Sequence, residues 1–212
     1  MNFSLKAMAA AVLLALPCAV QAQVDATVPL NVVSNPFSTN GTGYPASGRA
    51  GGFLADFTID FPETPGATFD DYLVWCIDAD RTIRVPGGPY TYAAYKAFDF
   101  AANTNFGGAN GYDLTAGDMK RIVGLVSDLQ VNWASYSELA RVQRQGSIWA
   151  LFRGETPVLS NLAEANLSGW YVLYNGQNQT LVTYVPEPSS AALVLTGIAA
   201  FMMLASMRRR RV

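Results

Sequence analysis

Residues 71–78, which read DYLVWCID, decide how the rest of the chain must fold. Within them the segment YLVWCI (72–77) is apolar at every position, which is typical of a strand covered on both faces. Such a strand needs another layer of structure on each side. It also carries Cys76, one of two cysteines in the chain, the other being Cys18.

Other strands are predicted on both sides of this segment. Residues 53–61 (FLADFTIDF) alternate between apolar and polar side chains, which indicates a half-buried strand. Residues 82–85 (TIRV) and 90–95 (YTYAAY) are expected to be further short strands, and residues 26–33 (ATVPLNVV) are a candidate strand. Residues 34–52 are rich in Gly, Ser, Asn and Pro, so they are predicted to form a long loop.

Two helices are predicted after these strands. Thr115 is followed three residues later by Asp118, which is a capping-box arrangement, and an apolar pattern of helical period follows it. A second helix is expected to begin at Ser135 with Glu138 and to end at Gly154, its face toward the sheet formed by Leu139, Val142 and Trp149.

A hairpin around Asn175-Gly176 completes the domain. The predicted fold class is α+β, a β-rich exported domain with an inserted pair of helices, flanked by a cleavable N-terminal signal helix and one C-terminal transmembrane helix. The expected division is residues 1–22, 23–185 and 186–212.

The N-terminus has the three parts of a secretory signal peptide. Lys6 precedes an apolar run at residues 7–20, and small residues occupy the positions before a cut after Ala22. A membrane anchor is disfavoured because the apolar run is short and contains Pro17. A lipoprotein cut before Cys18 is disfavoured because Pro17 stands where a small residue is needed.

The C-terminus predicts a single membrane span. Residues 189–207 carry no charge and have about the ~20 residues that a bilayer-spanning helix needs. An arginine cluster follows and is expected to stay on the cytoplasmic side, which leaves the folded part outside. The cluster comprises Arg208, Arg209, Arg210 and Arg211.

The triplet Pro186, Glu187 and Pro188 directly precedes this span. Triplet, span and arginine cluster together resemble the PEP-CTERM sorting signal of Gram-negative bacteria. The resemblance implies cutting near the triplet by an exosortase, a membrane protease, and a link to exopolysaccharide and biofilm matrix. The protein is then held in the inner membrane before processing and lies afterwards at the cell surface or in the matrix. The resemblance covers residues 185–212 and concerns only localisation.

Composition excludes several classes of function. Residues 23–185 hold nine basic and fifteen acidic residues, a net charge near −6, which argues against a nucleic-acid partner. The chain has no histidine, so a Ser-His-Asp triad, a Cys-His pair and an imidazole metal site are ruled out. No metal and no cofactor is expected, since one mature thiol is too few for zinc and the acidic fragments are too short for a calcium loop.

Three interpretations of Cys76 remain open. They are a buried inert residue, an intermolecular disulfide, and a bond from the cysteine sulfur to an atom other than sulfur. A disulfide fits poorly with a strand covered on both faces. A thiolate can also attack a glutamine side-chain amide and expel ammonia, leaving an internal thioester, and proximity supplies much of the barrier reduction. The second predicted helix contains two candidate glutamines, Gln143 and Gln145.

Residues 75–78 read WCID and residues 145–149 read QGSIW. Together they resemble the thioester domains of bacterial surface adhesins, which have an aromatic residue before Cys, often Ile and Asp after it, and a later Thr-Gln-x-Ala-Ile-Trp motif. The resemblance spans about residues 53–154 and includes the Pro/Gly turn and Tyr90 after the cysteine. Two positions depart from the motif, because Arg144 stands in place of Thr and Ser147 in place of Ala.

The resemblance implies a thioester between Cys76 and Gln145, with Trp75, Asp78 and Trp149 around it. Other aromatic side chains are expected to shield it from water, namely Tyr72 and the tyrosines of residues 90–95. The leading hypothesis is a non-enzymatic covalent adhesin that captures an amine or a polysaccharide hydroxyl. The alternative is a structural or carbohydrate-binding matrix protein with an inert Cys76. A Cys76 hydrolase ranks third, because no histidine activates the thiol.

Overall fold

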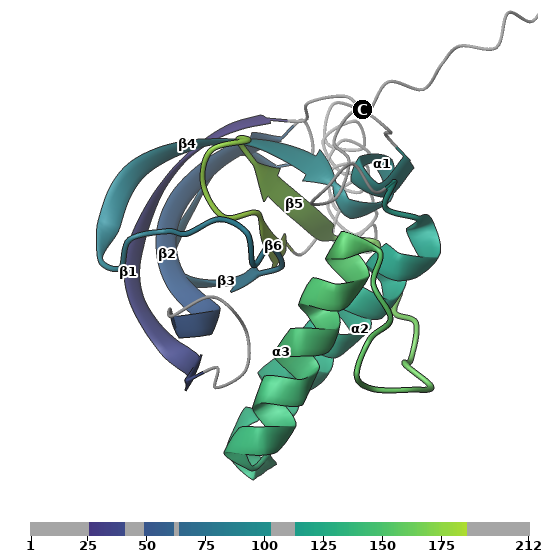
Figure 1. Ribbon diagram of the computed structural model, residues 1–212. Helices are drawn as coiled ribbons and strands as arrows, with labels where there is room; N and C mark the ends of the chain where they lie inside the picture. Colours follow the sequence, from purple (N-terminus) through teal and green to yellow (C-terminus); the bar gives the residue numbers. More distant parts are fainter. Residues whose placement is uncertain (1–25, 41–48, 62–63, 103–112, 186–212) are drawn as a thin grey trace, which may run out of the picture.

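A computed structural model describes residues 26–40, 49–61, 64–102 and 113–185. Its centre is a closed barrel of six antiparallel strands in the order β1-β2-β3-β6-β5-β4, with β4 pairing back onto β1 (Figure 1). The strands are β1 (Ala26–Asn40), β2 (Arg49–Phe61), β3 (Thr64–Cys76), β4 (Gly87–Lys96), β5 (Trp170–Tyr174) and β6 (Leu181–Tyr184). The barrel is closed between β3 and β6 at Trp75 and Cys76, the two β3 residues that pair with β6.

The predicted pair of helices is inserted between β4 and β5, together with a short helix that was not predicted. A short α1 (Ala97–Ala102) follows β4 directly, and a helical hairpin comes later in the chain. The hairpin consists of α2 (Ala116–Asn132), the 3-10 turn η3 (Trp133–Ser135) and α3 (Glu138–Arg153). Figure 1 shows α2 and α3 side by side, with one end of the pair against the barrel and the tip projecting beyond it. The domain is therefore β-rich with an inserted pair of helices.

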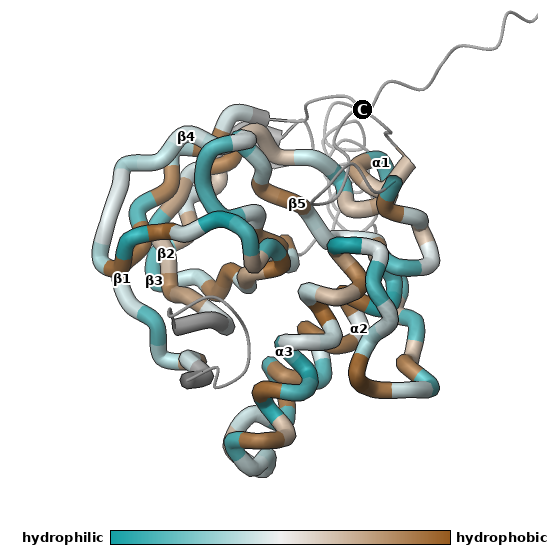
Figure 2. The backbone as a smooth tube through the Cα atoms, viewed as in Figure 1, coloured by the Kyte–Doolittle hydropathy of each residue, from teal (hydrophilic) through white to brown (hydrophobic). Residues whose placement is uncertain are grey.

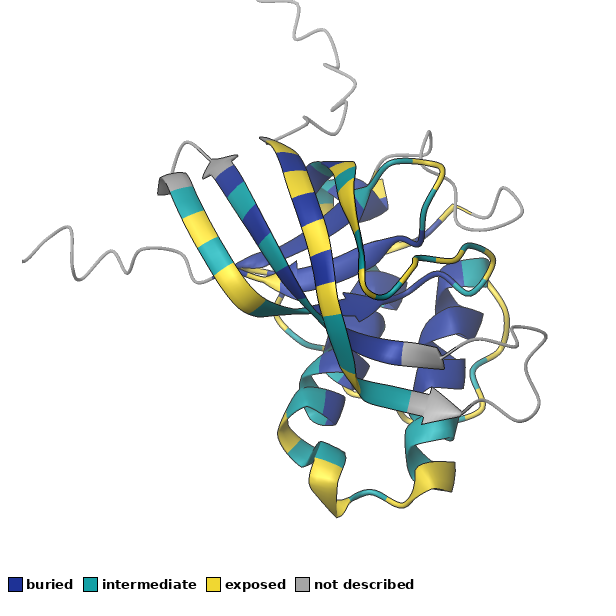
Figure 3. Cartoon of the chain, turned by 90° about the vertical axis from the view of Figure 1, so that its left-hand side faces the viewer, coloured by how far each residue is buried: buried dark blue, intermediate teal, exposed yellow. Residues whose placement is uncertain are grey.

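Period-two patterning builds the barrel interior. Phe53, Ala55, Phe57 and Ile59 are all at most 3% exposed, as their alternation predicted. Burying each large side chain of this kind contributes about 1.5–3 kcal/mol. Bands of buried and exposed residues alternate along the barrel strands in Figure 3, and hydrophobic and hydrophilic segments alternate in Figure 2. Within β3 only the last part, from Val74 onward, is buried continuously, and Tyr72 and Leu73 of the predicted covered segment are half-buried. Continuous burial also occurs in β5 at residues 170–173 and in β6 at residues 181–183.

The prediction that residues 34–52 form one long loop is wrong, because both ends of this stretch belong to strands. β1 continues to Asn40 and β2 begins at Arg49, because the two strands pair with each other, for example Phe37 with Gly52. Residues 82–85 form no strand; this stretch belongs to the irregular segment between β3 and β4.

The predicted N-terminal cap is confirmed for α2 but is wrong for α3. Thr115 caps α2 in the predicted capping box, its hydroxyl accepting from the Asp118 N–H at 3.1 Å. Ser137 rather than Ser135 caps α3, since Ser135 belongs to η3 and donates to the Asn132 carbonyl. Leu139 does not face the sheet: it is 66% exposed at the projecting tip of the hairpin.

The predicted hairpin around residues 175 and 176 is confirmed, and it joins β5 to β6. The Asn175 side-chain oxygen accepts from the N–H groups of Gln177 and Asn178, and Gly176 takes φ +73°. No helix in the described part of the chain has the length and hydropathy of a membrane span. The expected signal peptide, the Pro186–Pro188 triplet and the C-terminal span lie outside the described residues.

A glycine on β2 makes room for the Trp75 ring. Gly52 pairs with Trp75 across the sheet, and a Cβ at Gly52 would lie 2.7 Å from the indole ring. We expect Gly52→Ala to destabilise the protein by about 1–3 kcal/mol, because the buried ring has to shift. Urea unfolding measures this change. The matched control is Gly117→Ala in α2, whose Cβ would meet only the Thr115 hydroxyl at 3.6 Å. Equal stability of both variants would contradict the close-approach argument.

Candidate functional site

The candidate site lies where the end of β3 meets the buried face of α3. Cys76 is the last residue of β3 and is 0% exposed, and Gln145 is 2% exposed in the middle of α3. The Gln145 side-chain Nε2 donates to the Cys76 backbone carbonyl at 3.0 Å. The structure thus brings the Gln145 amide to the backbone of Cys76 in a site closed to solvent, while the Cys76 sulfur is hydrogen-bonded to the Asp78 carbonyl.

Trp75 holds the other end of the same amide. Its indole Nε1 donates to the Gln145 Oε1 at 2.8 Å. Trp75 is itself 0% exposed, so this hydrogen bond is made away from water. A buried amide is costly without partners, and here both its oxygen and its nitrogen are satisfied by β3. The contact therefore ties α3 to the barrel as well as orienting the amide.

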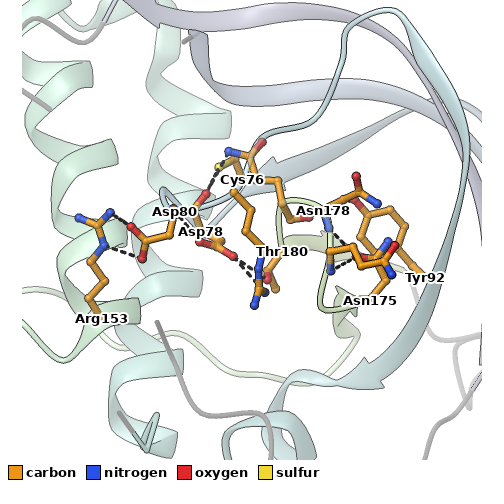
Figure 4. Close-up of polar contacts among 11 residues, drawn as sticks. Cys76, Asp78, Asp80, Tyr92, Arg153, Asn175, Asn178 and Thr180 are labelled. Atoms are coloured by element: carbon orange, nitrogen blue, oxygen red, sulfur yellow. Dashed lines mark hydrogen bonds and ion pairs between the residues drawn. The ribbon is translucent and has the colours of Figure 1, made fainter. Parts of the chain in front are cut away.

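The Cys76 thiol is held neutral by its surroundings. Burial raises its pKa to about 12, although hydrogen bonding from the Trp149 side chain and the Asp78 backbone opposes this rise. The sulfur donates to the Asp78 backbone carbonyl at 3.2 Å, as the close-up in Figure 4 shows. At neutral pH the group is a thiol rather than a thiolate, which is typical of a protected rather than a freely reactive cysteine.

Asp78 stabilises the turn after β3. Its carboxylate accepts from the Asp80 N–H at 2.9 Å and from the Thr180 hydroxyl at 3.2 Å, and Arg81 lies 3.5 Å away (Figure 4). Its backbone carbonyl also accepts from the Gln179 side chain at 3.0 Å. Asp78 therefore anchors the β5–β6 hairpin beside the thiol, and its carboxylate is committed to that role.

The aromatic surroundings differ in part from those predicted. Tyr72 lies elsewhere, with its hydroxyl on the Tyr184 carbonyl at 2.6 Å, so it does not cover the site. Among the tyrosines of residues 90–95, Tyr92 is the one whose pKa is affected by the thiol. Burial raises this pKa most, and the nearby Tyr90, Cys76 and Asp78 raise it further. The Tyr92 hydroxyl donates to the Gln179 backbone carbonyl.

Two aromatic neighbours of Trp75 were not predicted. Phe37 of β1 and Trp133 of η3 lie with ring centroids 6.0 and 5.7 Å from the Trp75 ring, and 5.5 Å from each other. The Arg141 guanidinium lies over Trp133 at 4.7 Å. Phe37 falls in the predicted loop and Trp133 in a turn, so no periodicity marked either residue.

The first departure from the adhesin motif, Arg144, has a structural role away from the amide. Arg144 donates to the Asp128 carboxylate at 2.7 Å and lies over the Tyr136 ring at 3.6 Å. Burial alone would raise the pKa of Asp128, but hydrogen bonds from Arg144, Tyr136 and Asn132 outweigh it and the pKa is lowered. Arg144 therefore links α2 to α3 near the hairpin tip.

The second departure, Ser147, fastens the chain that follows α3. Its hydroxyl donates to the Gln143 carbonyl at 2.9 Å and accepts from the Leu159 N–H at 3.1 Å. An alanine could make neither bond. The competing glutamine, Gln143, is only half-buried, whereas Gln145 is 2% exposed.

Chemically, the site presents a neutral thiol beside a fixed and dry carboxamide. No group of three or more Cys, His, Asp or Glu side chains within the described residues is placed to hold a metal ion. Comparison of the chain with protein-family models, with curated proteins and with solved structures finds no match.

We expect Arg144→Ala to destabilise the protein by about 1–2 kcal/mol, because it removes both an ion pair and a ring contact. The matched control is Arg121→Ala, whose contacts to Asp118 and Glu164 are 3.5 and 3.8 Å long; its loss should cost less than about 0.5 kcal/mol. Urea unfolding of both variants provides the measurement. Similar losses for the two arginines would show that the hairpin does not depend on Arg144.

Proposed function

We propose that this protein is an exported cell-surface or biofilm-matrix protein whose domain forms an internal thioester between Cys76 and Gln145. One observation carries the proposal: the Gln145 amide is buried, with its oxygen held by the Trp75 indole at 2.8 Å and its nitrogen held on the backbone carbonyl of Cys76 at 3.0 Å. This contact supports the proposal because it places the amide next to the residue that carries the thiol, and proximity of the two reacting groups can lower the barrier without a histidine.

Formation of the proposed thioester needs no reactant other than the Cys76 and Gln145 side chains. The Cys76 sulfur attacks the Gln145 Cδ, the S–C bond forms, and the C–N bond breaks. The thiol proton passes to the departing nitrogen, which leaves as ammonia. An arriving amine or hydroxyl then attacks the same carbon, gives one proton to the sulfur and leaves Cys76 free. The acyl bond that results is permanent, so the function is adhesion in a single turnover rather than enzymatic catalysis.

A second candidate function has its own support. The Gln145 amide is hydrogen-bonded at both its oxygen and its nitrogen, and burial raises the pKa of the Cys76 thiol to about 12, which also suits a contact that only holds α3 against the barrel. The protein is then a structural or carbohydrate-binding matrix module with an inert cysteine. The two functions differ in one covalent bond, so mass distinguishes them.

We expect the purified protein to weigh one ammonia less than its sequence, because thioester formation expels ammonia. Methylamine should add its own mass and release one thiol that iodoacetamide can alkylate. Cys76→Ala and Gln145→Ala should both have the full mass expected from their sequences. The matched control is Gln143→Ala, two residues earlier on α3, which should lose ammonia like the wild type. Full mass in the wild-type protein would favour the inert matrix module.

The localisation is also part of the proposal, and it rests on the sequence of residues 186–212. We expect replacement of Arg208, Arg209, Arg210 and Arg211 by glutamine to impair membrane retention or cutting near the Pro-Glu-Pro triplet, because the cluster fixes the orientation of the span. Fractionation of cells, medium and matrix, followed by blotting, measures this. An unchanged distribution would argue against a sorting signal.

A further inference from the structure

Hydrogen-bonding chemistry fixes which way the Gln145 amide faces. The Trp75 indole nitrogen can only donate, and a backbone carbonyl can only accept. The amide oxygen must therefore face Trp75 at 2.8 Å, and the amide nitrogen must face the Cys76 carbonyl at 3.0 Å. The flipped amide would set donor against donor at one end and acceptor against acceptor at the other.

We propose that Trp75 is a catalytic residue of the thioester site, an inference that rests on the proposed function. Its indole N–H polarises the Gln145 carbonyl and stabilises the negative charge that develops on Oε1. That charge appears when sulfur attacks Cδ to form the bond. It appears again when the nucleophile attacks the thioester. In both steps the N–H stays on the indole, and only the bonds at Cδ are made and broken.

The energetics favour a donor at this position. Trp75 and Cys76 are 0% exposed and Gln145 is 2% exposed, so water does not compete for the oxygen. A preorganised donor in a dry site stabilises developing charge far more than the same donor does in water. The site also needs such help, because burial raises the pKa of the Cys76 thiol to about 12 and keeps the attacking sulfur protonated.

The indole is held in place independently of the reaction. Its ring is packed against Gly52 of the paired strand, and the rings of Phe37 and Trp133 lie beside it with centroids 6.0 and 5.7 Å away. The Trp75 backbone is fixed between Gly52 and Val182 by the sheet. The donor therefore needs no rearrangement when charge develops, which is the requirement for preorganised stabilisation.

No other described side chain takes this role. The Trp149 side chain acts on the Cys76 thiol, where it opposes the rise in the pKa. Arg144, next to Gln145 in sequence, is turned toward Asp128. Within the part of the chain that the structure describes, the one hydrogen bond to Oε1 comes from Trp75.

The test compares full-length wild type with Trp75→Phe, which keeps a ring but removes the N–H. Ammonium treatment first converts any thioester back to glutamine, and mass spectrometry then follows the loss of ammonia after desalting. We expect Trp75→Phe to form the thioester about 100-fold more slowly, as is typical when one oxyanion donor is removed. The matched control is Trp170→Phe, a buried tryptophan on β5 whose ring pairs with Tyr184, and it should keep the wild-type rate.

A second variant separates lost chemistry from lost packing. Replacing Trp75 by benzothienylalanine keeps the shape of the two-ring system and exchanges the N–H for sulfur, so circular dichroism should be unchanged while the rate falls as for Trp75→Phe. Wild-type rates in either folded variant would overturn the role of Trp75 and leave the thioester intact. A wild-type protein that never loses ammonia would overturn both proposals.

Discussion

The rest of the structure depends on one buried amide that joins a helix to a strand. The last part of β3 is covered on both faces, so α3 has to lie against it, and that layer includes the polar side chain of Gln145. A buried carboxamide is tolerated only when its groups are hydrogen-bonded, and Trp75 and the Cys76 carbonyl satisfy it. The register of α3 against the barrel is thereby set, because a shift by one residue would leave the amide unpaired.

Much of the fold could be predicted from the sequence, because it follows from local patterns. Alternation at residues 53–61, the Thr115 capping box and the turn at Gly176 each need only neighbouring residues to be recognised. Residues 34–52 could not be predicted in the same way, since pairing between β1 and β2 overrides their loop-like composition. Leu139 fits helical periodicity but extends beyond the barrel that would have buried it.

The residues of the candidate site likewise fall into those that local sequence patterns indicate and those that only long-range packing brings together. Cys76 is marked in the sequence as a lone thiol in an apolar strand, and Gln145 is marked by the resemblance of its neighbours to a motif, whereas helical periodicity alone places Gln145 at the edge of the buried face. Phe37 and Trp133 could not be predicted, because they reach Trp75 from a different strand and from a turn. Long-range packing of this kind has no signal in a single sequence.

Burial has opposing effects on the chemistry of such a site. A thioester must be kept from water, and the closed contact between β3 and α3 provides this shielding. The same burial raises the pKa of the thiol to about 12, which removes the thiolate that would attack the amide. Proximity and polarisation of the carbonyl are the remaining means of lowering the barrier. The exclusion of water strengthens the hydrogen bond from Trp75 to Oε1, so in the proposed reaction the burial that weakens the nucleophile would also activate the electrophile.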